Sequence, residues 1–144
     1  MGLIGKECPD YGLTVNPVSG YILGMDFPPC ILASQSPQRA ALLTQMGIRF
    51  KVQPAPVDES LPANTPPEIA VRVLAKKKAL AWEQAYAEAQ PKEDSFLLTA
   101  DTLVVYDNHI MGKPQNLEEA RNFLRMLSGN THQVHTGIYI RPLG

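Results

Sequence analysis

Four groups of polar residues in the sequence have the side-chain types that bind or hydrolyse phosphates. They are Ser34, Ser36 and Arg39; Asp58 and Glu59; Asp101 and Thr102; and Gly112, Lys113 and Pro114. Hydroxyls and cations bind phosphate oxygens, while carboxylates ligate hard cations or accept a proton from water. The sequence has no Walker or dinucleotide-binding glycine pattern and no nucleophile elbow. This combination indicates metal-assisted hydrolysis of a phosphoanhydride.

The first group lies in the stretch CILASQSPQRAALLTQMG, where a strand is predicted to end and a helix to begin. Ser36 is a natural N-cap, and Pro37 fits the first helical position because its missing N–H is not needed there. Gly47 is the matching stop signal. Since unpaired N–H groups and a partial positive charge at a helix N-terminus attract anions, the turn is a candidate phosphate site. Taken alone, the stretch also fits an ordinary cap beside a surface arginine.

Asp101 directly follows the largely apolar residues 96–100, so it is predicted to stand at the C-terminal end of a buried strand. Ligands of open α/β sheets gather at such ends, where a carboxylate can hold a cation or take a proton from water. A loop cap is the alternative. Asp58 and Glu59 are either further oxygen ligands or solvated acids of a proline-rich loop.

Lysines supply the remaining candidate charges. Lys113 has a restrained backbone between glycine and proline, which suits a point charge aimed at phosphate. The alternative interpretation, and the ordinary one, is an exposed lysine in a loop. Residues 76–78 are three lysines that span about 200° of a predicted helix, so at least one must approach its apolar stripe. Periodicity does not say which. His132 and His135 are three apart on a predicted strand and face opposite sides, so they do not chelate one metal.

The elements that must position these groups alternate between strand and helix, which predicts an α/β domain with a partly parallel sheet. Strands are expected near residues 31–32, 48–52, 96–100 and 132–140, with residues 103–106 continuing beyond the third, and helices near 37–46, 65–89 and 117–128. Asp107 and Asn108 are expected to form a turn. Thr65 has capping-box spacing to Glu68. The last helix is predicted to start at an Asn116–Glu119 capping box and to keep an apolar stripe of Leu117, Ala120, Leu124 and Leu127.

Bulk properties place these elements in one domain. The chain has 144 residues, 44% hydrophobic and 19% charged, which suits one globular domain with a sizeable core. Residues 1–27, rich in glycine and proline, are expected to be a loose N-terminal extension of a domain over 28–144, with the working fold beginning near Met25.

The net charge, the cysteines and the hydropathy of the chain limit which binding partners and which cellular compartment are expected. A net charge of −1 argues against nucleic-acid binding. Cys8 and Cys30 form neither a CxxC motif nor a metal-ligand set, so a reducing cytoplasm is expected. No apolar stretch approaches the roughly 20 residues of a membrane span, so no membrane association is expected.

The order of the motifs resembles the Maf family of nucleoside triphosphate pyrophosphatases. The matching pieces are ILASQSPQR, VDES, LAKKKA, TADTLVV, GKP and LSGNTHQVHTG, which cover about residues 30–140. The resemblance implies a two-lobed α/β fold like that of inosine triphosphatases, with a mixed, twisted sheet flanked by helices around a central cleft. It also implies a divalent cation (Mg²⁺, Mn²⁺ or Co²⁺) and conversion of a nucleoside triphosphate to its monophosphate and pyrophosphate. A homodimer is left open.

The same resemblance implies roles for individual residues. These are phosphate binding by Ser34, Ser36, Arg39 and Lys113; metal binding by Glu59 and Asp101; and catalysis by Asp101, Lys78 and Lys113. Two departures stand out. Gln38 occupies a position where the family usually has arginine, which bears on phosphate binding or base preference. Family members also continue past the point where this chain ends, so the fold is expected to be C-terminally truncated, with a sheet face left uncovered.

The residues of these motifs resemble those of the family branch that acts on dTTP and UTP. This branch is expected to have a house-cleaning role in the nucleotide pool, the removal of non-standard or excess nucleotides. Gln38 keeps the branch that acts on 7-methyl-GTP open as an alternative. A further alternative is an inactive remnant that binds nucleotides or regulates cell division.

Overall fold

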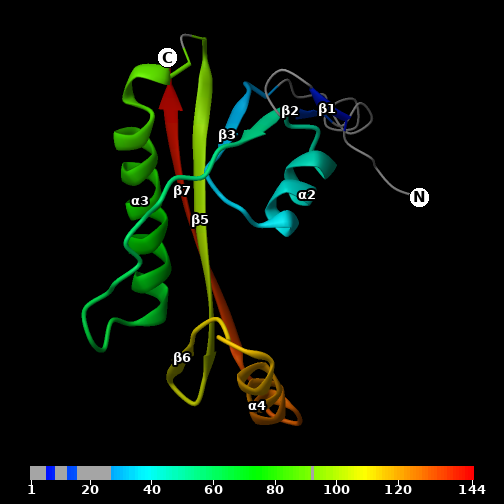
Figure 1. Cartoon of the computed structure of the whole chain (residues 1–144), viewed down its shortest axis with the longest axis vertical. Helices are drawn as coiled ribbons and strands as arrows, with labels where there is room; N and C mark the ends of the chain where they lie inside the picture. The colour runs from blue at the N-terminus through cyan, green and yellow to red at the C-terminus, as the bar shows by residue number, and fades with distance from the viewer. Residues whose placement is uncertain (1–5, 9–12, 16–26, 92) are drawn as a thin grey trace.

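The computed structural model describes residues 6–8, 13–15, 27–91 and 93–144 (Figure 1). Its strands are β1 (Lys6–Cys8), β2 (Leu13–Val15), β3 (Cys30–Leu32), β4 (Phe50–Val52), β5 (Ser95–Tyr106), β6 (His109–Met111) and β7 (Gln133–Leu143). Its helices are α2 (Pro37–Gln45), α3 (Pro67–Ala85), α4 (Leu117–Leu127) and the short 3-10 helix η1 (Ala87–Ala89). The predicted alternation of strands and helices in an α/β fold is therefore confirmed.

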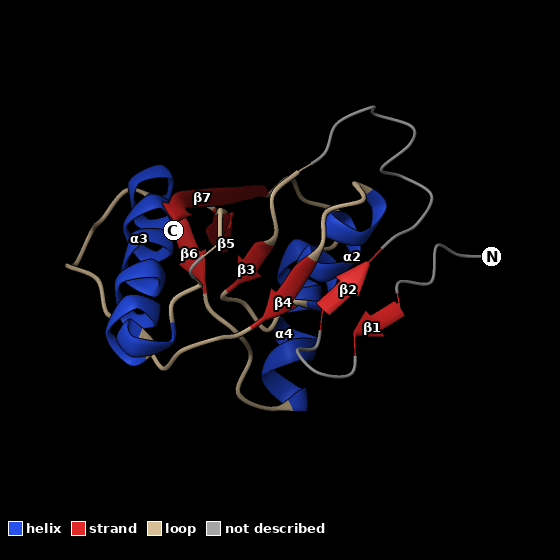
Figure 2. Ribbon diagram, turned by 90° about the horizontal axis from the view of Figure 1, so that it is seen from above, coloured by secondary structure: helices blue, strands red, loops and turns tan. Residues whose placement is uncertain are grey.

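The described strands form one mixed sheet in the order β1-β2-β4-β3-β5-β6, with β7 on the other edge of β5. β3 runs parallel to β4 and β5, and the remaining pairs are antiparallel. Helix α3 lies on one side of this sheet and α2 on the other (Figures 1 and 2). The mixed sheet flanked by helices agrees with the predicted fold class.

Strand β5 pairs with three other strands, β3, β6 and β7. One prediction about this strand was wrong. Asp101 does not end the strand but lies in its middle, because β7 pairs antiparallel with β5 from Ser95 to Val105 and keeps it extended. On the opposite edge, β5 pairs with β3 only up to Leu98 and with β6 from Val104 onward. Asp101 thus still lies beyond the C-terminal end of β3, in a window of the sheet between β3 and β6.

The two faces of β5 pack into two different hydrophobic clusters. Toward α3, Leu97 packs with Trp82 and Ala79 of the helix. Toward α2, Phe96 and Leu98 pack against the second cluster, which consists of Cys30, Leu32, Leu43, Ile48 and Phe50. Because successive strand residues point to opposite faces, odd-numbered residues of β5 face α3 and even-numbered residues face the α2 side. β5 and β7 extend beyond this body to carry β6 and α4, which gives the second lobe (Figure 1).

Local signals at the ends of α2 and α4 were predicted correctly. The Ser36 side chain accepts a hydrogen bond from the N–H of Arg39, Pro37 begins α2, and Gly47 follows the helix with φ of 74°. The Asn116 side chain caps α4 in the same way. The turn at residues 107–108 is present, with positive φ at both residues.

The start of α3 was predicted wrongly. Its N-cap is Pro66, without a side-chain cap, and the Thr65 hydroxyl donates instead to the carbonyl of Pro62. Because the prolines at 66 and 67 already hold φ near its helical value, the helix begins without a capping box. The helix also ends at Ala85 rather than Ala89.

An apolar surface is exposed at the second lobe. No residue of α4 is buried, and the side chains of Leu117 and Leu124 in its predicted stripe are each 68% exposed. On β7, Val134, Ile138 and Ile140 share one face and are also exposed.

Part of the expected N-terminal extension joins the sheet. β1 pairs with β2, and β2 pairs with β4. The rest of residues 1–26, and with it the expected start near Met25, lies outside the described residues. Within the described part of the chain, none of the helices has the length and apolar character needed to cross a membrane.

Candidate functional site

The window between β3 and β6 opens into a cleft of about 1050 Å³. The loop after β3, the first turn of α2, residues 54–61, α3, β5 and the loop after β6 all contribute to its walls. Its lining includes every residue to which the family resemblance assigns a role: Ser34, Ser36, Arg39, Glu59, Lys78, Asp101 and Lys113. The structure therefore brings together groups that are up to about 80 positions apart in the sequence.

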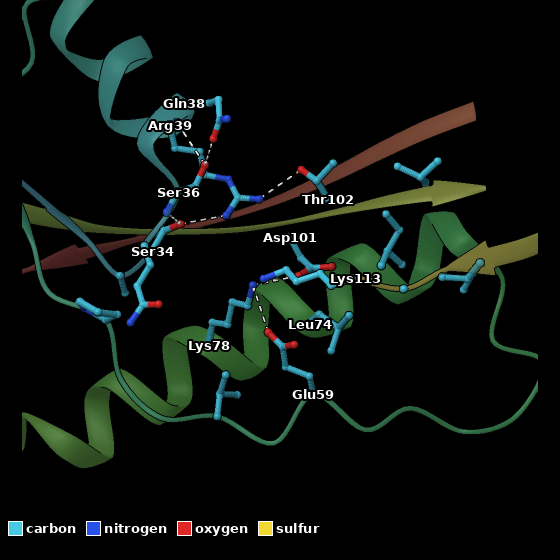
Figure 3. Close-up of a pocket in the computed structure, with 18 of the residues that line it drawn as sticks. Ser34, Ser36, Gln38, Arg39, Glu59, Leu74, Lys78, Asp101, Thr102 and Lys113 are labelled. Atoms are coloured by element: carbon cyan, nitrogen blue, oxygen red, sulfur yellow. Dashed lines mark hydrogen bonds and ion pairs between the residues drawn. The ribbon is translucent and has the colours of Figure 1, made fainter. Parts of the chain in front are cut away.

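Arg39 reaches the cleft from the α2 side and is held at two points. One guanidinium nitrogen donates to Ser34 Oγ at 2.9 Å, and the other donates to Thr102 Oγ1 at 3.1 Å. Thr102 in turn lies 2.9 Å from the hydroxyl of Thr136 on β7. Burial lowers the pKa of Arg39, and the charge of Asp101 partly offsets that effect. The result is a fixed, planar cation at the edge of the cleft (Figure 3).

The two serines have different tasks. Ser36 Oγ accepts from the N–H of Arg39 and donates to the side chain of Gln38, so its hydroxyl is used within the turn. Ser34 Oγ accepts from Arg39 and from the N–H of Ser36. Among the described residues nothing takes up the Ser34 hydroxyl hydrogen, which leaves it available to a phosphate oxygen.

Lys78 is the lysine of the predicted triple run that points into the cleft. It lies on the face of α3 that carries Leu74 and Trp82, whereas Lys77 donates to the carbonyl of Ser60 and Lys76 is exposed. The Lys78 ammonium lies 2.8 Å from Asp101 Oδ1 and 3.5 Å from a carboxylate oxygen of Glu59. Figure 3 shows it between these two acids.

Asp101 is the most buried charged group of the site. It is 7% exposed, because it is an odd-numbered residue of β5 and faces α3. Its Oδ1 binds Lys78, while its Oδ2 is buried and has no hydrogen-bond partner among the described residues. A buried carboxylate oxygen without a partner is costly, so a cation or a water at this position would stabilise the fold as well as the site.

Only the second acid of the Asp58–Glu59 pair belongs to the cleft. The carboxylate of Asp58 accepts from the N–H of Ser60 at 2.9 Å and from its hydroxyl at 2.8 Å. These bonds lower the pKa of Asp58. Asp58 therefore shapes the loop that presents Glu59, and Glu59 lines the cleft opposite Lys78.

Lys113 comes from the second lobe. It is exposed, in the loop that follows β6, and it lines the same cleft as Asp101. It therefore places a cation on the far side of the window from Arg39.

The donor set fits a hard divalent cation that is completed by the substrate. Asp101 and Glu59 offer carboxylate oxygens, which Mg²⁺ prefers, and Mg²⁺ is usually held by one or two carboxylates together with waters and phosphates. In the described part of the chain, no group of three or more His, Cys, Asp or Glu side chains could hold a metal ion by itself.

Thr102 was a candidate from its place beside Asp101, but its contact with Arg39 was not predicted, and Thr136 was not singled out as a site residue. Thr136 shares a predicted strand face with Val134 and Ile138, but its contact with Thr102 depends on the register of β7 on β5. The pair could be found from the sequence only if the register between the two strands were known. A single sequence does not determine that register.

The comparison with known proteins decides the family. The model of the Maf-like protein family matches residues 29–143. This chain belongs to the Maf-like protein family. The predicted resemblance is thereby confirmed.

Several Maf-like relatives carry the name dTTP/UTP pyrophosphatase. The protein of Pseudoalteromonas atlantica is 46% identical over 110 residues, which are 76% of this chain and 56% of the relative. The protein of a Geobacillus species has the same identity and the same coverage. That of Porphyromonas gingivalis is 44% identical over 111 residues, 76% of this chain and 54% of the relative. The chain thus spans about half the length of the curated relatives it matches.

Proposed function

We propose that this chain supplies the catalytic cleft of a nucleoside triphosphate pyrophosphatase that acts on dTTP or UTP. One observation carries the proposal: a single cleft combines the cations Arg39, Lys78 and Lys113 with the carboxylates Asp101 and Glu59. The relatives named dTTP/UTP pyrophosphatase support the choice of substrate. The reaction is hydrolysis of the bond between the α- and β-phosphates, which yields a nucleoside monophosphate and pyrophosphate.

The cations bind and orient the triphosphate. Arg39 presents a rigid guanidinium, and the Ser34 hydroxyl and the N-terminus of α2 add donors beside it. Lys113 binds phosphate oxygens from the opposite lobe as a mobile point charge. Because these groups come from both lobes, a bound triphosphate bridges the cleft and holds the scissile bond near Asp101.

Asp101 is the general base of the proposed reaction. One oxygen of its carboxylate accepts the proton of the attacking water, and the other is available to a cation. A divalent cation (Mg²⁺, Mn²⁺ or Co²⁺) held by Asp101 and Glu59 would neutralise phosphate charge and polarise the bond that breaks.

A substrate panel tests this proposal. Pyrophosphate release by the purified chain is measured with dTTP, UTP, CTP and 7-methyl-GTP in the presence of Mg²⁺ or Mn²⁺. We expect dTTP and UTP to give the highest kcat/KM. Preference for 7-methyl-GTP would move the chain to the other branch. Binding of dTTP without release from any nucleotide by the folded chain would contradict the catalytic assignment and favour a nucleotide-binding role.

A further inference from the structure

Lys78 holds together two carboxylates that come from different elements. Its Nζ lies 2.8 Å from Asp101 Oδ1, 3.5 Å from Glu59 Oε1 and 3.2 Å from the carbonyl oxygen of Ala100 (Figure 3). Two of the three ammonium donors have hydrogen-bond partners in Asp101 and Ala100, and Glu59 adds an ion pair at the longest distance of the three. A single positive charge thus lies between two negative charges, at a side chain that is only 17% exposed.

In the described part of the chain, the second oxygen of Asp101 has no hydrogen bond that a ligand would have to break. Oδ2 is buried, and the described residues provide no hydrogen-bond partner for it. The side chain of Glu59 is 55% exposed, so solvent reaches the other carboxylate directly. A cation can therefore approach the pair of acids at Glu59, and beside it Asp101 keeps one oxygen without a partner among the described residues.

A divalent cation and the ammonium group compete for this pair of acids. Mg²⁺ binds carboxylate oxygens at about 2.1 Å, so a cation in contact with both Asp101 and Glu59 would lie within a few ångströms of Nζ. Two positive charges repel strongly at that separation in a partly buried site. Lys78 is the group that gives way, because its ammonium sits on a long, flexible stem.

We infer that Lys78 is the resident counter-cation of the Asp101 and Glu59 carboxylates, and that a divalent cation binds them by displacing its ammonium group. The inference rests on the proposed function only in the choice of a divalent cation as the ligand. Once displaced, the ammonium remains in a cleft lined by Arg39 and Lys113, with its three donors free for phosphate oxygens. Cation binding thereby adds a phosphate ligand to the site.

Binding of Mn²⁺, measured by electron paramagnetic resonance without any nucleotide, tests this inference. Lys78→Met removes the charge and keeps most of the stem. Lys76→Met is the matched control, since it makes the same change in net charge at an exposed position of the same helix. We expect Lys78→Met to bind Mn²⁺ about tenfold more tightly than the wild type, the size of a typical coupling between two sites. Lys76→Met should stay within about twofold of the wild type, well below such a coupling.

A double variant tests whether the tighter Mn²⁺ binding of Lys78→Met occurs at Asp101. Adding Asp101→Asn to Lys78→Met should abolish the tighter binding, because the cation then lacks its buried ligand. Equal or weaker Mn²⁺ binding by Lys78→Met, or no binding by either protein, would overturn the inference. In the first case Lys78 would be a support that orients Asp101 for the cation.

A measurement on the wild-type chain avoids any effect of the substitution on folding. Acetylation of each lysine amine is followed by peptide mass spectrometry with and without saturating Mg²⁺. The Lys78 amine should react several-fold faster with Mg²⁺, and the Lys76 amine should not change. An unchanged Lys78 rate would overturn the inference. Neither readout needs turnover, so a chain that passes both tests and hydrolyses nothing would contradict the proposed function alone.

Discussion

Gly137 on β7 lies directly opposite Asp101 on β5. At this point α3 comes so close to the sheet that a Cβ on Gly137 would lie 2.5 Å from the carbonyl carbon and oxygen of Val71. Any side chain there would push the helix away from the sheet. The same helix carries Lys78, so the contact between Lys78 and Asp101 depends on a helix position that the glycine permits.

Gly137→Ala should therefore destabilise the fold by about 3 kcal/mol, the upper part of the usual range for overpacking, because the clash is with helix backbone that cannot rotate away. Urea unfolding measures the loss. Gly112→Ala is the control, since nothing lies within 4 Å of a Cβ at Gly112. Equal stability of the two variants would show that α3 does not approach the sheet as closely as described.

Replacement of Arg39 should separate its charge from its geometry. Arg39→Lys keeps the positive charge but cannot bind Ser34 and Thr102 simultaneously through a planar fork. We expect roughly tenfold weaker binding of pyrophosphate, which corresponds to about 1.4 kcal/mol. Isothermal titration measures the affinity, and Arg49→Lys, at an exposed position, is the control. If both variants bind as the wild type does, Arg39 is not a phosphate ligand.

Ser36 offers a test of whether the N-terminus of α2 meets phosphate. Ser36→Ala should cost about 1 kcal/mol of stability through loss of the cap. Ser36→Asp should keep the cap and the stability, but its negative charge should weaken pyrophosphate binding. Unfolding and titration of both variants distinguish the two effects. Unimpaired binding by Ser36→Asp would place the phosphates elsewhere in the cleft.

Burial of Cys30 makes stability fall at high pH. Burial raises the pKa of the Cys30 thiol from 9.0 to about 12. The unfolded chain then loses the thiol proton first, so the contribution is full below about pH 9 and is lost as pH rises toward 12. Between pH 8 and pH 10 the wild type should lose about 1.4 kcal/mol more stability than Cys30→Ala. Equal losses in urea unfolding would contradict this.

Features set by a few neighbouring residues were predictable from the sequence. The cap at Ser36, the stop at Gly47 and the turn at residues 107–108 each depend on the conformational preferences of one or two residues. The site residues were found because their types and order match a family, and the structure gathers them in one cleft.

Features that depend on distant parts of the chain were not predictable. Asp101 lies inside β5 rather than at its end because β7, more than 30 residues later, holds the strand extended. Which lysine of residues 76–78 enters the cleft depends on how α3 lies over the sheet, and Gly137 of a distant strand permits its close approach. The apolar stripe of α4 was predicted, but a pattern within one helix does not say whether another element covers it.

The most direct test of the proposed function is pyrophosphate release from dTTP with Mg²⁺ by the wild type and by Asp101→Asn. The substitution keeps the shape of the side chain but removes the charge that binds Lys78 and accepts a proton. The account predicts measurable release by the wild type and a loss of about 10³-fold in the variant, within the usual range for a general base. Equal rates in the two proteins, or no release by the folded wild type, would contradict it.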